Sequence, residues 1–113
     1  MHELAITQSM LDIVLGEAGK SGMDRVNRIN LVVGELSGYV TDSIQFYFDF
    51  LAKDSIAEGA ELCFILIEAR ARCRRCETDF KLPEFDWNCP QCGSGDIEIT
   101  AGRELRVESI EAD

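Results

Sequence analysis

The sequence predicts an α+β protein in which a small β-sheet packs with two helices and carries an inserted zinc-ribbon-like module. Three observations predict this class. In two segments apolar residues recur at helical spacing. Other segments are either continuously apolar or alternate apolar and polar residues, which is typical of strands. A cysteine-rich stretch that is poor in aliphatic residues interrupts them. A chain of 113 residues has room for one domain with a small appended module.

The first helix is expected from Leu4 to about Ala18, where apolar residues recur at helical spacing. Its apolar face comprises Leu4, Ile6, Met10, Leu11, Ile13, Leu15 and Ala18, and its polar face Thr7, Gln8, Asp12 and Glu17. Gly19 and Gly22 are expected to close the helix, because glycine readily adopts the left-handed backbone geometry that follows helix C-termini.

A second helix is expected to start with Thr41 or Asp42 as its cap and to run to about Ala52. The residues predicted for its buried face are Ile44, Tyr47, Phe48 and Leu51. Residues 26–34, which precede it, alternate apolar and polar side chains and predict a strand. Residues 61–68, which follow it, form a nearly continuous apolar run that suits a strand covered on both faces.

The composition changes at Ala69, and the strand pattern returns only after Asp96. The intervening stretch holds four cysteines and too few aliphatic residues to bury much of a core, so another interaction must stabilise it. The simplest arrangement returns the last strand to the first sheet. This divides the chain into an α/β domain of residues 1–68 and 97–113 and an inserted zinc-binding module of residues 69–96.

Charge and hydropathy exclude several classes of protein. The chain has 11 Lys and Arg against 21 Asp and Glu, a formal charge of −10, which argues against nucleic acid as the main partner because phosphate binding needs clustered cations. No apolar run approaches the roughly 20 residues that span a bilayer. The N-terminal MHELAIT lacks the basic region of a signal peptide, so we expect a cytoplasmic protein.

Four of the five cysteines form two Cys-x-x-Cys pairs, Cys73 with Cys76 and Cys89 with Cys92. Each pair can place two thiolates on one ion, and the spacing between the pairs is close to that of a zinc ribbon. Four thiolates fill every position of a tetrahedral zinc, which predicts a structural ion. Iron in a rubredoxin-like site and two disulfides are the alternatives. The fifth, Cys63, stands in an apolar strand and is expected to be a core residue.

His2 is the only histidine, and it follows Met1. Methionine is generally retained before a residue as large as histidine. The α-amine of Met1, the backbone nitrogen of His2 and the imidazole Nδ1 can then close chelate rings on one ion. The backbone nitrogen of Glu3 or another donor could complete a square plane, a geometry that suits Ni(II) and Cu(II). A histidine at position 2 can also be accidental, and the residues alone leave both interpretations open.

Five features follow one another along essentially the whole chain. They are Met1-His2-Glu3-Leu4, Gly34-Glu35-Leu36-Ser37, the two Cys-x-x-Cys pairs ending in Cys89-Pro90-Gln91-Cys92-Gly93, Gly102-Arg103-Glu104-Leu105, and Ser109-Ile110-Glu111. Together they resemble the HypA/HybF family of hydrogenase maturation factors for nickel insertion. No single motif would suffice, but their order and spacing are specific.

The resemblance implies a small sheet with two helices and an inserted zinc module. It implies nickel cargo at Met1, His2 and Glu3, and structural zinc at Cys73, Cys76, Cys89 and Cys92. It also implies two partners, the maturation GTPase HypB and the precursor of the [NiFe] hydrogenase large subunit. We expect metal relay, not catalysis, by a monomer or weak homodimer that binds neither nucleic acid nor a membrane.

The competing interpretation is a zinc-ribbon interaction module that binds nucleic acid or a protein without nickel. It rests on Trp87 and on a basic stretch formed by Arg70, Arg72, Arg74 and Arg75. These arginines could instead offset the negative charge of a zinc tetrathiolate. Steeply salt-dependent retention on DNA or RNA would support the interaction module, whereas a rubredoxin-like electron carrier would be coloured.

Overall fold

The computed structural model describes residues 2–83 and 86–113, and of His2 only the backbone. The elements are α1 (His2–Lys20), β1 (Val26–Gly34), α2 (Thr41–Leu51), β2 (Glu61–Ile67), β3 (Arg70–Cys73), β4 (Asp79–Lys81), β5 (Ile97–Ala101) and β6 (Leu105–Ala112). Packing divides the chain into two compact units. The first holds Met1–Val32, Gly38–Ile65 and Arg106–Asp113, and the second holds Val33–Ser37 and Leu66–Leu105.

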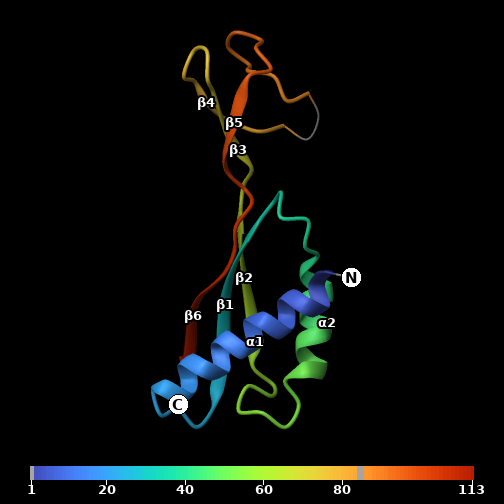
Figure 1. The fold of residues 1–113 in the computed structure, drawn as a ribbon, viewed down its shortest axis with the longest axis vertical. Coiled ribbons are helices and arrows are strands. Elements are labelled where there is room, and N and C mark those ends of the chain that lie inside the picture. The colour runs from blue at the N-terminus through green and yellow to red at the C-terminus, as the bar shows by residue number, and fades with distance from the viewer. Residues whose placement is uncertain (1, 84–85) are drawn as a thin grey trace. The chain divides into compact units, whose positions relative to one another are not determined.

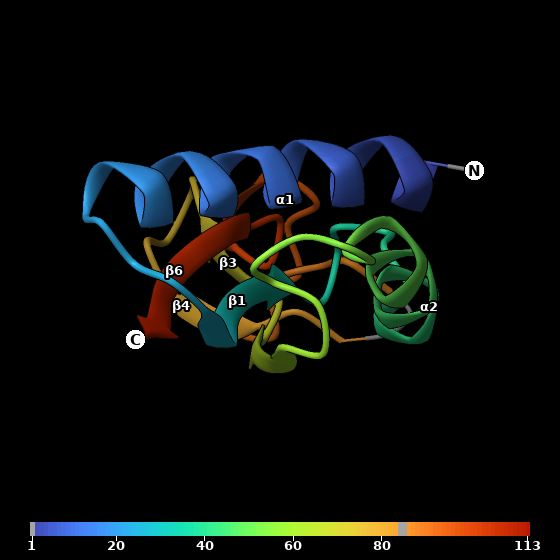
Figure 2. The ribbon, with the colours of Figure 1, turned by 90° about the horizontal axis from the view of Figure 1, so that it is seen from below.

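The first unit is built on a mixed three-stranded sheet with the strand order β2-β1-β6. Arg25 and Asp113 exchange backbone hydrogen bonds of 3.2 and 2.8 Å, so the start of β1 meets the end of β6 and the two strands are antiparallel. Figures 1 and 2 show α1 lying across this sheet, with α2 beside it. The side chains most deeply buried in this unit include Val14, Ile29, Leu31, Ile44 and Phe48. The predicted fold, a sheet with two helices and a separate cysteine-bearing part, is confirmed.

Both predicted helices form, and Gly22 closes α1 as expected, whereas Gly19 lies within the helix. Gly22 has a φ of +68°, while Met23 N donates to Ala18 O at 2.9 Å and Gly22 N to Gly19 O at 3.2 Å. This is the Schellman arrangement, which satisfies the last carbonyl groups of a helix. No described helix is long and apolar enough to cross a membrane.

Two expectations about the first unit are wrong. Neither Thr41 nor Asp42 caps α2. The N-cap residue is Val40, and there is no side-chain cap hydrogen bond at this end of the helix. The apolar run of β2 is not covered on both faces, since Ile65 is 40% exposed and Leu66 is 70% exposed. The reason is position: β2 pairs with β1 alone and is an edge strand.

The second unit holds a separate antiparallel sheet with β3 between β4 and β5 (Figure 1). Ala71 pairs with Phe80 on one side and with Ile99 on the other. One face of β3 is buried and the other exposed, which fits its alternation of small and charged residues. A small core forms from Ala69, Ala71, Cys73, Phe80, Leu82 and Cys89, with Leu36, Ile97 and Ile99 packed against it. The sequence assigned residues 97–105 to the first domain, whereas β5 pairs within the second sheet.

Candidate metal centre

The four paired cysteines converge in the second unit. Their Sγ atoms, from Cys73, Cys76, Cys89 and Cys92, all lie within 4.8 Å of one another. The distance from Cys73 Sγ to Cys92 Sγ is 3.5 Å, and that from Cys76 Sγ to Cys89 Sγ is also 3.5 Å. Each short distance therefore joins the two pairs rather than lying within one pair. The convergence of two sequence-distant knuckles is what the predicted tetrathiolate site requires.

Both knuckles have the same backbone construction. In the first, Glu77 N donates to Cys73 O at 2.9 Å and Cys73 N to Thr78 O at 2.9 Å. In the second, Gly93 N donates to Cys89 O at 2.8 Å and Cys89 N to Ser94 O at 2.8 Å. The fourth residue after each leading cysteine is left-handed, with φ of +61° at Glu77 and +77° at Gly93. Glycine adopts this conformation readily, so Gly93 suits its position, whereas Glu77 carries no sequence signal for it.

Backbone amides point at the leading sulfur of each knuckle. Cys76 N lies 3.5 Å from Cys73 Sγ, and Cys92 N lies 3.5 Å from Cys89 Sγ. Gln91 N also donates to Cys89 Sγ at 3.3 Å. These hydrogen bonds hold each leading sulfur in a fixed place within its turn. The turns therefore position these sulfurs to bind a cation.

The two outer cysteines differ in acidity. The hydroxyl of Thr78, 3.1 Å from Cys76 Sγ, is the main cause that lowers the pKa of Cys76 to about 6. At Cys92 a backbone hydrogen bond from Ser94 acts in the same direction, but the hydrogen bond with Cys73, burial and the other two sulfurs outweigh it. The pKa of Cys92 rises to about 11. Of these two thiols, that of Cys76 therefore ionises more readily than that of Cys92.

The sulfur cluster fits a tetrahedral metal ion. Zn–S bonds of about 2.3 Å would place the sulfurs about 3.8 Å apart, close to the observed 3.5 Å contacts. A disulfide needs a bond of about 2.05 Å, and all five cysteines are free in the structure. Cys63 lies half-buried in β2 and is not part of the described cluster.

Two of the four arginines in the basic stretch beside the cluster form ion pairs with carboxylates. Arg72 forms an ion pair with Glu77 at 3.1 Å, and Arg74 with Asp96 at 3.0 Å. Arginines engaged in this way are poorly placed to hold a phosphate backbone, which weakens the case for nucleic acid. Trp87, the aromatic residue of the competing interpretation, is partly exposed.

The predicted nickel ligands belong to the start of α1. Met1 and the side chain of His2 lie outside the described part of the chain, whereas the backbone of His2 opens the helix. Glu3 Oε2 accepts a hydrogen bond from Val40 N at 3.1 Å. This contact is the main cause that lowers the pKa of Glu3. Behind it, the buried Thr7 hydroxyl donates to Glu3 O at 2.5 Å.

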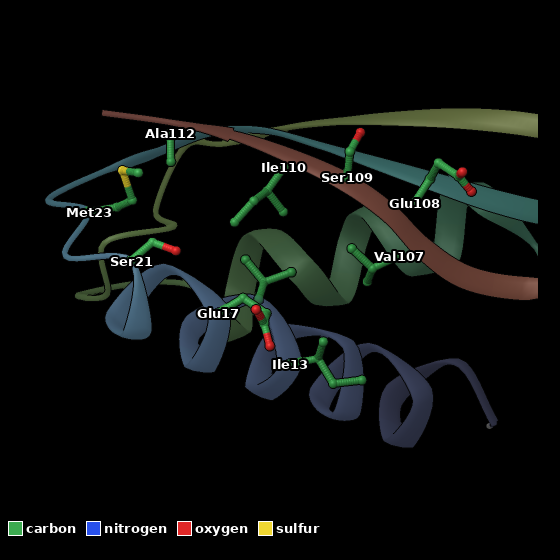
Figure 3. A pocket seen from close by; sticks show the side chains of 10 residues that line it. Ile13, Glu17, Ser21, Met23, Val107, Glu108, Ser109, Ile110 and Ala112 are labelled. Carbon is green, nitrogen blue, oxygen red and sulfur yellow. The ribbon is translucent and has the colours of Figure 1, made fainter.

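A groove in the first unit offers little for a metal. It encloses about 430 Å³ between α1 and β6. Figure 3 shows Val107 and Ile110 pointing toward α1, whereas Glu108 and Ser109 point away from it. Glu17 on α1 forms an ion pair with Lys20 at 3.7 Å. The groove is therefore mainly apolar and lacks a converging set of ligands.

Comparisons with known proteins bear on the function of this chain. Residues 1–112 match the model of the family described as "Hydrogenase/urease nickel incorporation, metallochaperone, hypA". The hydrogenase maturation factor HypA of Caldanaerobacter subterraneus subsp. tengcongensis is 40% identical, and the match covers 100% of both chains. That of Dehalococcoides mccartyi is 42% identical over 100% of this chain and 95% of its own length.

Solved structures show the same fold. A solution structure of a HypA protein superposes with a TM-score of 0.76 at 25% identity, covering 99% of this chain and 96% of the other. The Ni metallochaperone HypA from Helicobacter pylori gives a TM-score of 0.67 at 23% identity, with 97% and 96% covered, and supports the fold alone. The resemblance predicted from the sequence motifs is confirmed. The chain belongs to the HypA family and is a nickel-incorporation metallochaperone of hydrogenase maturation, not an enzyme.

Proposed function

We propose that this chain carries Ni(II) on its N-terminal segment, bound through Met1, His2 and Glu3, and delivers it for assembly of the [NiFe] hydrogenase active site. A zinc ion on Cys73, Cys76, Cys89 and Cys92 stays with the protein as a structural ion. Nickel is the cargo. The observation that carries this proposal is that α1 begins at His2, so that the predicted ligands His2 and Glu3 are the first two residues of the helix.

The start of a helix is a favourable place for amide nitrogens to bind a metal. The first N–H groups of a helix have no carbonyl partner one turn earlier, so loss of their protons breaks no helical hydrogen bond. The helix dipole places partial positive charge at this end, which stabilises a deprotonated, anionic nitrogen. Backbone nitrogens of His2 and Glu3 could therefore join the Met1 amine and the His2 imidazole around one ion. Such tetragonal nitrogen sites suit Ni(II) and Cu(II).

Zinc is the ion that best suits the cysteine cluster. Four thiolates leave no open position, and zinc has no redox chemistry and accepts tetrahedral sulfur readily. Binding would also supply folding energy to a unit whose own core is small. We propose that residues 69–96 form this zinc-binding module, whose sheet β5 completes, and that the nickel-binding domain is built from residues 1–68 and the C-terminal part of 97–113 that contains β6.

The family to which the chain belongs suggests its partners. We propose that the chain acts in the cytoplasm with the GTPase HypB and with the precursor of the hydrogenase large subunit, as a monomer or weak homodimer. Because copper binds nitrogen ligands more tightly than nickel, affinity alone cannot select the metal. Selection would come from metal supply and from docking with these partners.

Equilibrium dialysis against nickel tests the proposal. The untagged chain is compared with His2→Ala and with a variant extended by two residues before Met1, which displaces the terminal amine. We expect both variants to lose nickel while keeping zinc and their circular dichroism spectrum. Gln8→Ala, on the exposed side of α1, serves as the matched control and should bind normally. Unchanged stoichiometric binding in the extended chain would refute the N-terminal site.

A further inference from the structure

The helix α2 begins without a cap from its own residues. Its N-cap, Val40, has an extended backbone with φ of −93° and ψ of 118° and an apolar side chain that cannot accept a hydrogen bond. Val40 O accepts from Ser43 N and Ile44 N, both at 3.1 Å, so the first turn is otherwise regular. Helices usually place a polar acceptor at this end. Here an acceptor from another element binds the N–H of the N-cap residue itself, the group that a carboxylate takes in a capping box.

That acceptor is Glu3 on α1. Its Oε2 atom lies 3.1 Å from Val40 N, although the two residues are 37 positions apart in sequence. A carboxylate at the N-terminus of a helix also interacts favourably with the helix dipole. The contact therefore ties the first turn of α1 to the start of α2.

We propose that Glu3 is a positioning residue for nickel, whose carboxylate clamps the start of α1 to the N-cap of α2 and thereby fixes the backbone nitrogens of His2 and Glu3. The inference rests on the proposed function and deepens it. The backbone nitrogen of Glu3 would bind the metal, while its carboxylate accepts the hydrogen bond from Val40 N at the start of α2. The Thr7 hydroxyl, which donates to Glu3 O at 2.5 Å, holds the same residue from the following turn.

The alternative role for Glu3 is that its carboxylate binds nickel directly. The two roles make opposite demands on Val40. If Glu3 is a clamp, loss of the Val40 N–H donor should weaken nickel binding. If the Glu3 carboxylate is a nickel ligand, loss of that donor should free the carboxylate and leave nickel binding unchanged or tighter. A change at Val40 that leaves Glu3 intact therefore separates the roles.

Val40→Pro removes this donor but keeps the carbonyl group of residue 40, which accepts hydrogen bonds from the first turn of α2. Proline at position 40 requires a φ near −65°, a modest shift from −93°. Val40→Ala keeps the N–H and is the matched control. Glu3→Ala removes the acceptor, and Glu3→Gln keeps an oxygen that can accept from Val40 N.

The test is nickel titration of these untagged variants, followed by the d–d absorption band of bound Ni(II) and the rate of nickel loss to a chelator. We expect Val40→Pro and Glu3→Ala each to weaken binding about fivefold and to speed loss similarly, the scale of a lost cap. The double variant should lose no more than either single variant. Val40→Ala and Glu3→Gln should bind as the native chain does, and the absorption band should keep its position throughout.

Two results would overturn the clamp. One is a shifted absorption band in Glu3→Ala with normal or tighter binding in Val40→Pro, which would make the carboxylate a ligand. The other is additive losses in the double variant, which would show that the two groups act independently. If Val40→Pro loses its helical circular dichroism, Glu3→Gln and Glu3→Ala are compared instead. Equal loss of nickel affinity in these two variants would contradict the clamp, because only Glu3→Gln keeps an acceptor for Val40 N. Failure of the native chain itself to bind nickel would instead refute the proposed function.

Discussion

The carbonyl group of Gly102 lies so close to Gly34 that there is no room for a side chain at Gly34. A Cβ atom on Gly34 would lie 2.2 Å from both the carbonyl carbon and the carbonyl oxygen of Gly102. Hydrogen bonds of 2.6 Å from Leu36 N to Gly102 O and 2.7 Å from Gly34 N to Glu104 O hold the segments together. Gly102, with φ of +118°, in turn lies against Ala69. Glycine at these two positions is therefore a structural requirement of the second unit.

Gly34→Ala should destabilise the protein by about 3 kcal/mol or more, since the obstructing atoms belong to backbone and cannot turn aside. Urea unfolding followed by circular dichroism measures this. Gly16→Ala is the control because it makes the same change in α1, where nothing lies within 4 Å. It should stabilise the helix by roughly 0.5–1 kcal/mol. Equal effects of the two substitutions would contradict the close approach.

Replacing Cys89, whose side chain is buried, by serine should abolish zinc binding and unfold the region of residues 70–95, because binding of the ion and folding are coupled there. Cys63→Ser removes a thiol of the same kind from β2 and should leave the zinc content unchanged. Elemental analysis of the purified proteins gives zinc per chain. A normal zinc content in Cys89→Ser would argue against a four-cysteine site.

Thr78→Val should cause zinc to leave at a higher pH. The Thr78 hydroxyl is the main cause of the lowered pKa of Cys76, about 6 against an ordinary 9.0. A depressed pKa keeps the sulfur ionised as pH falls, and the advantage disappears as pH passes through that value. Loss of the hydroxyl raises the pKa, so protons displace the metal earlier during acidification.

Zinc release during acid titration, monitored with a chromogenic chelator, checks this expectation. Thr100→Val is the matched control. Thr100 is exposed and lies near the end of β5, whereas the residue of β5 that pairs with Cys73 is Ile97, at the start of the strand. Its release curve should coincide with that of the native chain. A Thr78→Val curve that coincides as well would show that the hydroxyl does not support the thiolate.

Much of the architecture can be predicted from periodicity. The strand over residues 26–34 has the bounds that alternation indicates, and both helices lie where apolar spacing places them. The orientation of α1 is less well predicted. Ile13, assigned to the apolar face, is 56% exposed, whereas Thr7, assigned to the polar face, is fully buried. Thr7 is tolerated because its hydroxyl donates to Glu3 O within the helix, and hydropathy alone does not register such a bond.

The metal cluster could be predicted because its signal is local. Two Cys-x-x-Cys knuckles specify their own turns, and four soft ligands suit few ions. The contact between Glu3 and Val40 could not be predicted, since it joins residues far apart in sequence and involves an N-cap residue, Val40, that the sequence did not indicate. Long-range contacts of this kind depend on the packing of the helices, which residue patterns do not encode.

The central claim is that one chain holds two metals at separate places, a resident zinc on cysteines and a transported nickel on the N-terminus. Native mass spectrometry of the untagged protein, titrated with nickel and then treated with a mild chelator, tests it most directly. We expect one zinc and one nickel on a chain that retains Met1, with nickel leaving first and zinc remaining. Nickel that displaces zinc from the cysteines, or a chain that takes up no nickel beside its zinc, would contradict the account.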